Sequence, residues 1–194
     1  MKYKLIVVLG IISGLLKGQN SIDWDGKYQL QFSDFQSTTT KIGHVAIYSL
    51  NTGAYIDFLF HMSNVEFILT KNFNSKVNCS FKRNAASLVA PDSSKALNLL
   101  ELARYDFDLS ELYARKFRKK MYEEKNAFSD ISFYKPIYDE IQKEFTERST
   151  IASSDTDLGK NREKLQGLHK EVLIEIEQLS DFCKYCKPPK KRGK

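Results

Sequence analysis

Few side chains of this chain are suited to catalysis, and they are widely spaced. Carboxylates occur at Glu101 and Asp106 within one amphipathic segment, and the three histidines are His44, His61 and His169. A carboxylate and an imidazole can share a metal ion or transfer a proton, as hydrolases require. No histidine belongs to the paired-histidine spacing of a helical metal site. One hypothesis is a hydrolase in which Asp106 or Glu101 works with His169, and the alternative is that the histidines are surface or hydrogen-bonded groups.

The segment with the most specific pattern spans residues 99–116 and reads LLELARYDFDLSELYARK. It resembles the signature helix of the bacterial secreted family called domain of unknown function 922, whose helix reads roughly L-L-x-H-E-Q-x-H-F-D-I-x-E-x-Y-A-R-K. Members of that family are predicted zinc-dependent proteases, so the resemblance implies a protease-like scaffold. The matching residues are Phe107, Asp108, Glu111, Tyr113, Ala114, Arg115 and Lys116.

The residues that would do the chemistry in this family do not match. In an H-E-x-x-H helix two imidazoles bind zinc and the glutamate accepts a proton from the metal-bound water. In the same register Leu102 and Asp106 stand at the histidine positions and Ala103 at the glutamate position. A further family stretch, T-x-H-G-x-N, aligns with residues 156–161 and places Leu158 at its histidine. The resemblance therefore implies a degenerate site with no catalytic residue, metal or cofactor.

We accordingly expect an exported, non-catalytic protease-like protein that binds a peptide, a glycan or another envelope component where substrate would lie. The alternative is a structural or assembly component, tethered to an anionic envelope by its basic tail. Nucleic acid is not an expected partner, since the formal net charge of +6 depends on lysines before residue 18 and on the basic residues after 186. The remaining body is slightly acidic.

The N-terminus has the pattern of a secretory signal peptide. Lys2 and Lys4 precede an apolar run over residues 5–16, and Gly18 lies near the expected cleavage site. An uncleaved membrane anchor is the alternative, although a confident span needs about 20 apolar residues. We expect a signal peptide at residues 1–18, one domain at 19–186, a disordered basic tail at 187–194, and no membrane span after cleavage.

The three cysteines indicate a disulfide rather than redox catalysis. Cys183 and Cys186 form a Cys-x-x-Cys pair at the end of a predicted helix, where the helix dipole disfavours a thiolate. A local disulfide between them is one possibility in an exported protein. The other is a bond from Cys79 to either of them, which would pin the last helix to the sheet.

Alternating apolar and polar residues predict an N-terminal, mostly antiparallel sheet. The predicted strands span residues 28–35, 46–48, 55–60, 65–69, 77–81 and 87–89. Helical periodicity begins after residue 91, so the chain is expected to be of the α+β class.

Three helices are predicted after the sheet. They span about residues 92–124, with Asp92 or Ser93 as the N-cap, then 136–148 and 156–182, with a loop at 149–155. The inward face of the first carries Leu99, Leu102, Asp106, Leu109, Tyr113 and Phe117. Its spacing also predicts ion pairs from Arg104 to Asp108 and from Glu111 to Arg115 on a solvated or scaffold face.

Overall fold

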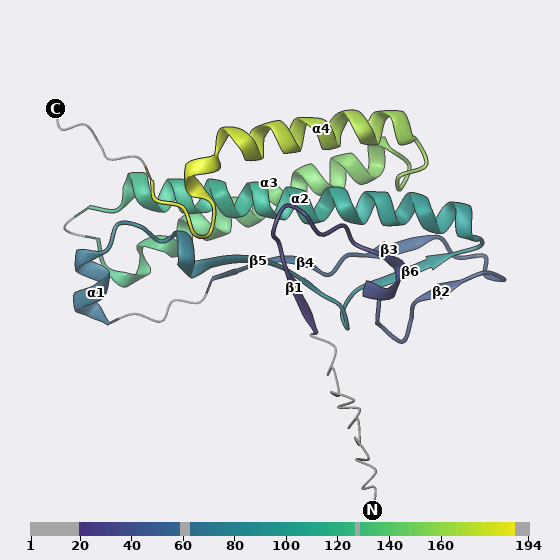
Figure 1. Ribbon diagram of the computed structural model, residues 1–194, viewed down its shortest axis with the longest axis horizontal. Helices are drawn as coiled ribbons and strands as arrows, with labels where there is room; N and C mark the ends of the chain where they lie inside the picture. The colour runs from purple at the N-terminus through teal and green to yellow at the C-terminus, as the bar shows by residue number, and fades with distance from the viewer. Residues whose placement is uncertain (1–19, 59–62, 127–128, 189–194) are drawn as a thin grey trace, which may run out of the picture.

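The computed structural model describes residues 20–58, 63–126 and 129–188. The expected signal peptide lies outside these residues, as does the basic tail beyond residue 188. The described chain has short strands in its N-terminal half, followed by three long helices (Figure 1). The predicted α+β class is therefore confirmed.

Six strands among the described residues form two small sheets rather than the one expected. They are β1 (Ser21–Asp23), β2 (Lys41–Ile42), β3 (Ser49–Asn51), β4 (Ala54–Phe58), β5 (Val77–Lys82) and β6 (Ser87–Ala90). The first sheet has the order β1-β5-β4 with both pairs antiparallel. The second has the order β2-β6-β3, in which β3 is antiparallel and β2 parallel to β6. The pairing is mostly antiparallel, as predicted.

The α-helices of the described residues are α1 (Asn64–Leu69), α2 (Ser93–Glu124), α3 (Tyr134–Asp155) and α4 (Arg162–Gln178). Short 3-10 helices are η1 (Phe32–Asp34), η2 (Asn74–Lys76), η3 (Ile131–Phe133) and η4 (Ser180–Phe182). The side chain of Asp92 caps α2 by accepting a hydrogen bond from the backbone N–H of Lys95 at 2.8 Å. Both predicted ends of this helix are confirmed.

Helix α2 is the centre of the core, because it packs against the strands on one side and against α3 and α4 on the other (Figure 1). The predicted inward residues of α2 are all buried, from Leu99 to Phe117. They meet β5 through Phe81 and α4 through Val172 and Ile176, which are buried in the same cluster. Asp106 is thus a carboxyl group on an otherwise apolar helix face.

The strand predicted for residues 28–35 is wrong, since the chain there makes the 3-10 turn η1. The carboxylate of Asp34 is fully buried and accepts hydrogen bonds from the backbone N–H of Gln31 at 2.8 Å and from the hydroxyl of Tyr28 at 2.9 Å. The guanidinium of Arg83 donates to it at 2.7 Å. A buried, fully satisfied carboxylate therefore organises this segment more strongly than the alternation of apolar residues does.

The strand predicted for residues 65–69 is also wrong, because this segment forms helix α1. The side chain of Ser63 accepts a hydrogen bond from the backbone N–H of Glu66 at 3.1 Å and so caps the helix. Phe67 is buried, whereas Val65 and Leu69 are exposed. The alternation of Val65, Phe67 and Leu69 therefore does not mark one buried face.

Further boundaries differ from the prediction, among them the start of α3 at Tyr134 and the end of α4 at Gln178. The strand expected at residues 46–48 begins at Ser49. Helix α3 continues to Asp155, so the loop predicted at residues 149–155 is helical. The last helix begins at Arg162 rather than at 156. The side chain of Asn161 caps this start by accepting a hydrogen bond from the N–H of Lys164 at 3.1 Å. The longer α3 matters for the site described below.

The local disulfide between Cys183 and Cys186 is confirmed, with an S–S distance of 2.06 Å. Pairing of Cys79 with either residue is wrong, because Cys79 is a free thiol buried in the core. Burial raises the pKa of the Cys79 thiol well above its usual value. Cys79 is therefore held as a neutral apolar group.

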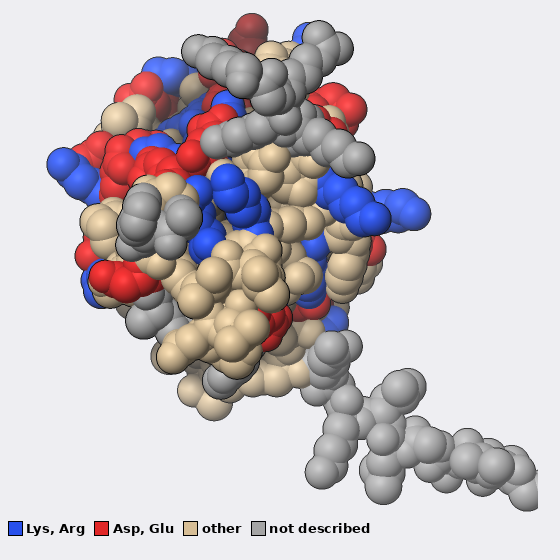
Figure 2. All heavy atoms as spheres, turned by 90° about the vertical axis from the view of Figure 1, so that its left-hand side faces the viewer, with Lys and Arg blue, Asp and Glu red and all other residues tan. Residues whose placement is uncertain are grey.

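Figure 2 shows the end of the molecule at which α1 lies. Basic and acidic side chains are mixed on its upper part, and an uncharged area occupies its lower middle. Helix α1 contributes the exposed apolar side chains of Val65, Ile68 and Leu69. On the described part of this face there is no continuous basic surface of the kind that a nucleic-acid-binding domain presents.

No helix within residues 20–58, 63–126 and 129–188 has both the length and the apolar character that crossing a bilayer requires.

Candidate functional site

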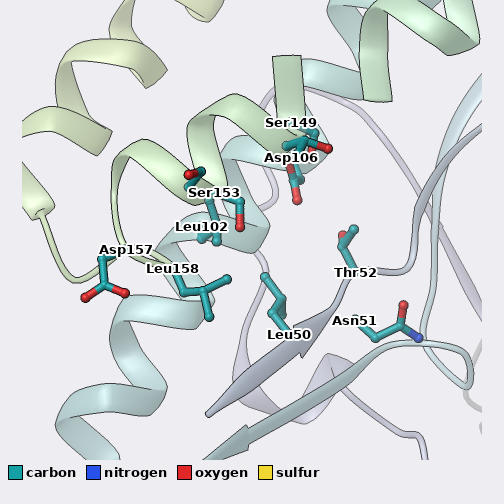
Figure 3. A pocket seen from close by; sticks show the side chains of 11 residues that line it. Leu50, Asn51, Thr52, Leu102, Asp106, Ser149, Ser153, Asp157 and Leu158 are labelled. Carbon is teal, nitrogen blue, oxygen red and sulfur yellow. Dashed lines mark hydrogen bonds between the residues drawn. The ribbon is translucent and has the colours of Figure 1, made fainter. Parts of the chain in front are cut away.

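Leu102, Asp106 and Leu158 lie around one pocket, although Leu158 is far from the other two in sequence. The pocket has a volume of about 570 Å³, which is within the usual range for a small-molecule site. Figure 3 shows the carboxyl group of Asp106 directed toward the space between Leu102 and Thr52, with Leu50 and Leu158 bordering the same space. The positions singled out in the sequence therefore meet at one concave site.

Four segments of the chain build the walls of this pocket. Helix α2 contributes Leu102 and Asp106. The end of β3 and the residues after it contribute Leu50, Asn51 and Thr52, and the connection after α3 contributes Asp157 and Leu158. The last two turns of α3 contribute the hydroxyl-bearing side chains of Ser149, Thr150, Ser153 and Ser154. The lining therefore combines apolar, hydroxyl and acidic groups.

A turn with unusual backbone angles places Leu158 in the wall. The φ values are 48° at Asp157, 53° at Leu158 and 82° at Gly159. These values lie in the left-handed region, which is unfavourable for residues other than glycine. The hydroxyl of Thr156 accepts a hydrogen bond from the N–H of Gly159 at 3.0 Å. The hydroxyl of Tyr48 donates to the carbonyl of Leu158 at 2.8 Å, which joins the turn to the segment before β3. These two hydrogen bonds hold the strained turn in place beside the segment before β3.

Gly159→Ala is expected to lower the free energy of unfolding by about 2 kcal/mol or more, since a left-handed φ costs a non-glycine residue roughly 1–3 kcal/mol. In addition, a Cβ at this position would lie 2.4 Å from the carbonyl oxygen of Asn98 in α2. The measurement is urea denaturation of both proteins. Gly167→Ala is the matched control, because a Cβ in that helical position meets nothing within 4 Å and should stabilise by about 0.5–1 kcal/mol. Equal effects of the two substitutions would contradict this account of the turn.

Asp106 is the ionisable group at the base of the pocket. Its side chain is almost wholly removed from solvent, with a residue exposure of 5%. The hydroxyl of Ser149 donates to Oδ1 at 2.8 Å, and the structure records no partner for Oδ2 among the described residues. Burial raises the pKa of Asp106 to about 7, and the bond from Ser149 offsets only part of that rise. The group therefore changes charge near neutral pH.

These residues do not fit the zinc ion that the resemblance implies for the family. A catalytic zinc site normally has three protein ligands. Of the three converging side chains only Asp106 carries a ligand atom, because Leu102 and Leu158 are hydrocarbons. Ala103 is buried and offers no proton acceptor. No group of three or more His, Cys, Asp or Glu side chains that could hold a metal occurs in the part of the chain that the structure describes.

The residues of α2 that match the family helix lie away from the pocket. The predicted pair of Glu111 and Arg115 is confirmed at 2.9 Å between Oε1 and Nε, but both are buried rather than solvated. Tyr113 is also buried and packs edge-on against Phe145 with ring centroids 6.0 Å apart. Burial raises the pKa of the Tyr113 hydroxyl. These matched residues hold helices together.

The predicted pair of Arg104 and Asp108 is wrong. Arg104 donates instead to Glu101 at 2.7 Å and to the carbonyl of Leu30. Asp108 accepts a hydrogen bond from Nε1 of Trp24 at 2.6 Å, and its other oxygen lies 2.6 Å from Nε2 of His169. Tertiary partners from both ends of the chain therefore displace the local ion pair.

Neither of the two described histidines, His44 and His169, lines the pocket of Asp106. His44 is exposed and has a φ of 55°, and His61 lies outside the described residues. His169 contacts Asp108 and, with Glu101, borders two small cavities separate from the pocket of Asp106. Asp106 and His169 therefore line different cavities, whereas Glu101 and His169 border the same two, and the hydrogen-bonded interpretation of His169 is confirmed.

The hydroxyl-bearing wall was not predicted, because residues 149–155 were expected to form a loop. One signal for a longer helix was available in the sequence. After Pro136 the first glycine or proline is Gly159, so no helix-breaking residue stops α3 at Arg148. A helix through this segment would have placed Ser149 and Ser153 on one face.

Comparison with known proteins adds no relative. No protein-family model, no curated protein sequence and no solved structure matches this chain.

Proposed function

We propose that this chain is an exported, non-catalytic binding protein with a protease-like arrangement around its pocket. The observation that carries the proposal is the convergence of Leu102, Asp106 and Leu158 on one pocket of about 570 Å³. A lining of leucines, hydroxyls and two carboxyl groups can contact both apolar and hydrogen-bonding parts of a ligand. The ligand is a peptide, a glycan or another envelope component. Export is supported by the N-terminal pattern of residues 1–18.

The lack of catalysis is inferred from the types of side chain at the pocket. Leu102 and Leu158 have no ligand atom, and Ala103 has no group that could accept a proton from water. Asp106 would be the single acid or base at the base of the pocket, and His169 lies elsewhere, bound to Asp108. Hydrogen bonds and apolar contact are therefore the interactions that this pocket offers.

The test is a titration of the protein with a set of short peptides and oligosaccharides, in which binding is monitored through the amide chemical shifts in NMR spectra. We expect at least one probe to shift the amides of Leu102, Asp106 and Leu158. Ser153→Phe would fill the pocket and should abolish that shift, whereas Thr146→Phe, on an exposed position of the same helix, should leave it.

Two results would contradict the proposal. One is the absence of any probe that reaches the pocket amides. The other is stoichiometric zinc, measured by mass spectrometry, together with cleavage of casein that a chelator abolishes.

A further inference from the structure

The charges around the pocket are of one sign. Asp106 and Asp157 line it, and of the residues described there none is a lysine, an arginine or a histidine. Asp157 is exposed and forms an ion pair with Lys160 at 3.0 Å, so its charge is already compensated. The uncompensated acidic group at this site is therefore Asp106.

Asp106 has less bonding than a buried carboxylate needs. A carboxylate out of water is stable only when it is paired with a cation or with several hydrogen-bond donors. The donor recorded for the side chain of Asp106 is the hydroxyl of Ser149 at 2.8 Å, on Oδ1. Oδ2 has no recorded partner in the described chain, and the carboxyl group is directed into the pocket (Figure 3). A cationic donor from a ligand would complete its bonding.

The remaining walls fit an aliphatic chain behind such a donor. Leu50, Leu102 and Leu158 border the space in front of Asp106 (Figure 3). Methylene groups can pack on these leucines while the charged end reaches the carboxylate, as the stem of a lysine side chain does on apolar surfaces. Ser149 and Ser153 add hydroxyl groups that can accept further N–H bonds.

From this geometry we propose that the pocket binds a primary ammonium group on a short aliphatic stem, with the carboxylate of Asp106 as its counter-ion. The inference rests on the proposed binding function and names the chemistry of its ligand. A lysine side chain of a peptide and a free alkyl diamine both carry this group. The ammonium donates to Oδ2, and the stem lies against the leucines.

The affinity should rise with pH, because Asp106 must be ionised while the ammonium group keeps its proton up to about pH 10. Of the other ionisable groups near this site, burial raises the pKa of Tyr105 to about 12. Arg148 forms an ion pair with Glu175 of α4, and Asp157 forms one with Lys160. With a pKa of about 7, the ionised fraction of Asp106 rises about thirtyfold from pH 5.5 to pH 8, and the affinity should rise by about the same factor.

The experiment is a titration of the full chain with n-pentylamine, 1-pentanol and pentanoate at pH 8. Binding is monitored through the amide chemical shifts in NMR spectra. We expect pentylamine to shift the amides of Leu102, Asp106 and Leu158, with pentanol at least tenfold weaker and pentanoate inactive. Asp106→Asn should lower the pentylamine affinity at least tenfold. Asp155→Asn is the matched control, since this exposed carboxylate pairs with Lys164 outside the pocket.

The outcomes separate this inference from the proposed function. Equal binding of pentanol and pentylamine, or unchanged affinity in Asp106→Asn, would overturn the ammonium site and leave pocket binding in place. No shift with pentylamine would also overturn the ammonium site, and the peptide and glycan probes would then decide the proposed function. Comparison of 1,5-diaminopentane with Nα-acetyl-lysine amide distinguishes a free diamine from a peptide side chain as the better ligand.

Discussion

Glu111→Gln is expected to lower the free energy of unfolding by about 3–5 kcal/mol, because removing one partner of a buried ion pair leaves a charge uncompensated. Glu111 is 3% exposed and Arg118 is fully buried. Oε1 of Glu111 accepts hydrogen bonds from Nε of Arg115 and from Nη1 of Arg118, both at 2.9 Å. A neutral glutamine would leave two buried guanidinium groups without this counter-charge.

The same guanidinium groups tie α2 to three other elements. Arg115 donates to the carbonyl of Ile176 in α4 at 2.8 Å. Arg118 donates to Val77 in β5 at 2.9 Å and to Phe182 in η4 at 3.0 Å. Because the cluster joins the sheet side to the helix side, its loss should lower the stability of the whole domain rather than of one helix end.

The measurement is urea denaturation followed by the fluorescence of Trp24, the only tryptophan of the chain. Glu147→Gln in α3 is the control, because Glu147 and Lys143 form an exposed i,i+4 pair at 3.9 Å. Exposed pairs of this kind contribute roughly 0–1 kcal/mol. If Glu111→Gln destabilises no more than the control, the buried cluster does not hold the domain together as described.

Local signals in the sequence were sufficient for α2. Its N-cap at Asp92, its apolar spacing and its end at Glu124 all depend on residues within a few positions of each other. The pair of Glu111 and Arg115 was predictable for the same reason. Its burial was not, because α4 and η4, which supply the covering carbonyl groups, lie about 60 residues further along the chain.

The partners of Asp108 show the limit of local reasoning. The i,i+4 spacing favoured Arg104, but Trp24 and His169 take the carboxylate from 84 and 61 residues away. An exposed helical ion pair contributes only about 0.3–0.5 kcal/mol, so a tertiary contact readily replaces it. The pocket was predictable in part, because one of its walls depends on local spacing alone. Leu102 and Asp106 share a face of one helix, whereas the wall from α3 depended on where that helix ends.

Asp106→Asn is expected to stabilise the protein at pH 8 and to have little effect at pH 4. Burial raises the pKa of Asp106 from 3.8 to about 7. Between these pH values the folded protein keeps a proton that the unfolded chain releases, so the wild-type stability falls as the pH rises. Since one pKa unit corresponds to about 1.4 kcal/mol, the loss from this group approaches about 4 kcal/mol above pH 8. Asparagine has no carboxyl proton to lose, so the variant avoids this loss of stability.

The measurement is the difference in unfolding free energy between Asp106→Asn and the wild type at intervals from pH 4 to pH 8.5. Contributions from the other carboxyl groups cancel in this difference, so its slope reports on Asp106. Asp155→Asn is the matched control, because Asp155 is exposed and its ion pair with Lys164 lies outside the pocket. A flat difference for Asp106→Asn would mean that water or a counter-ion reaches the carboxylate in the free protein. The cost of an unpaired carboxylate could then no longer favour an ammonium ligand.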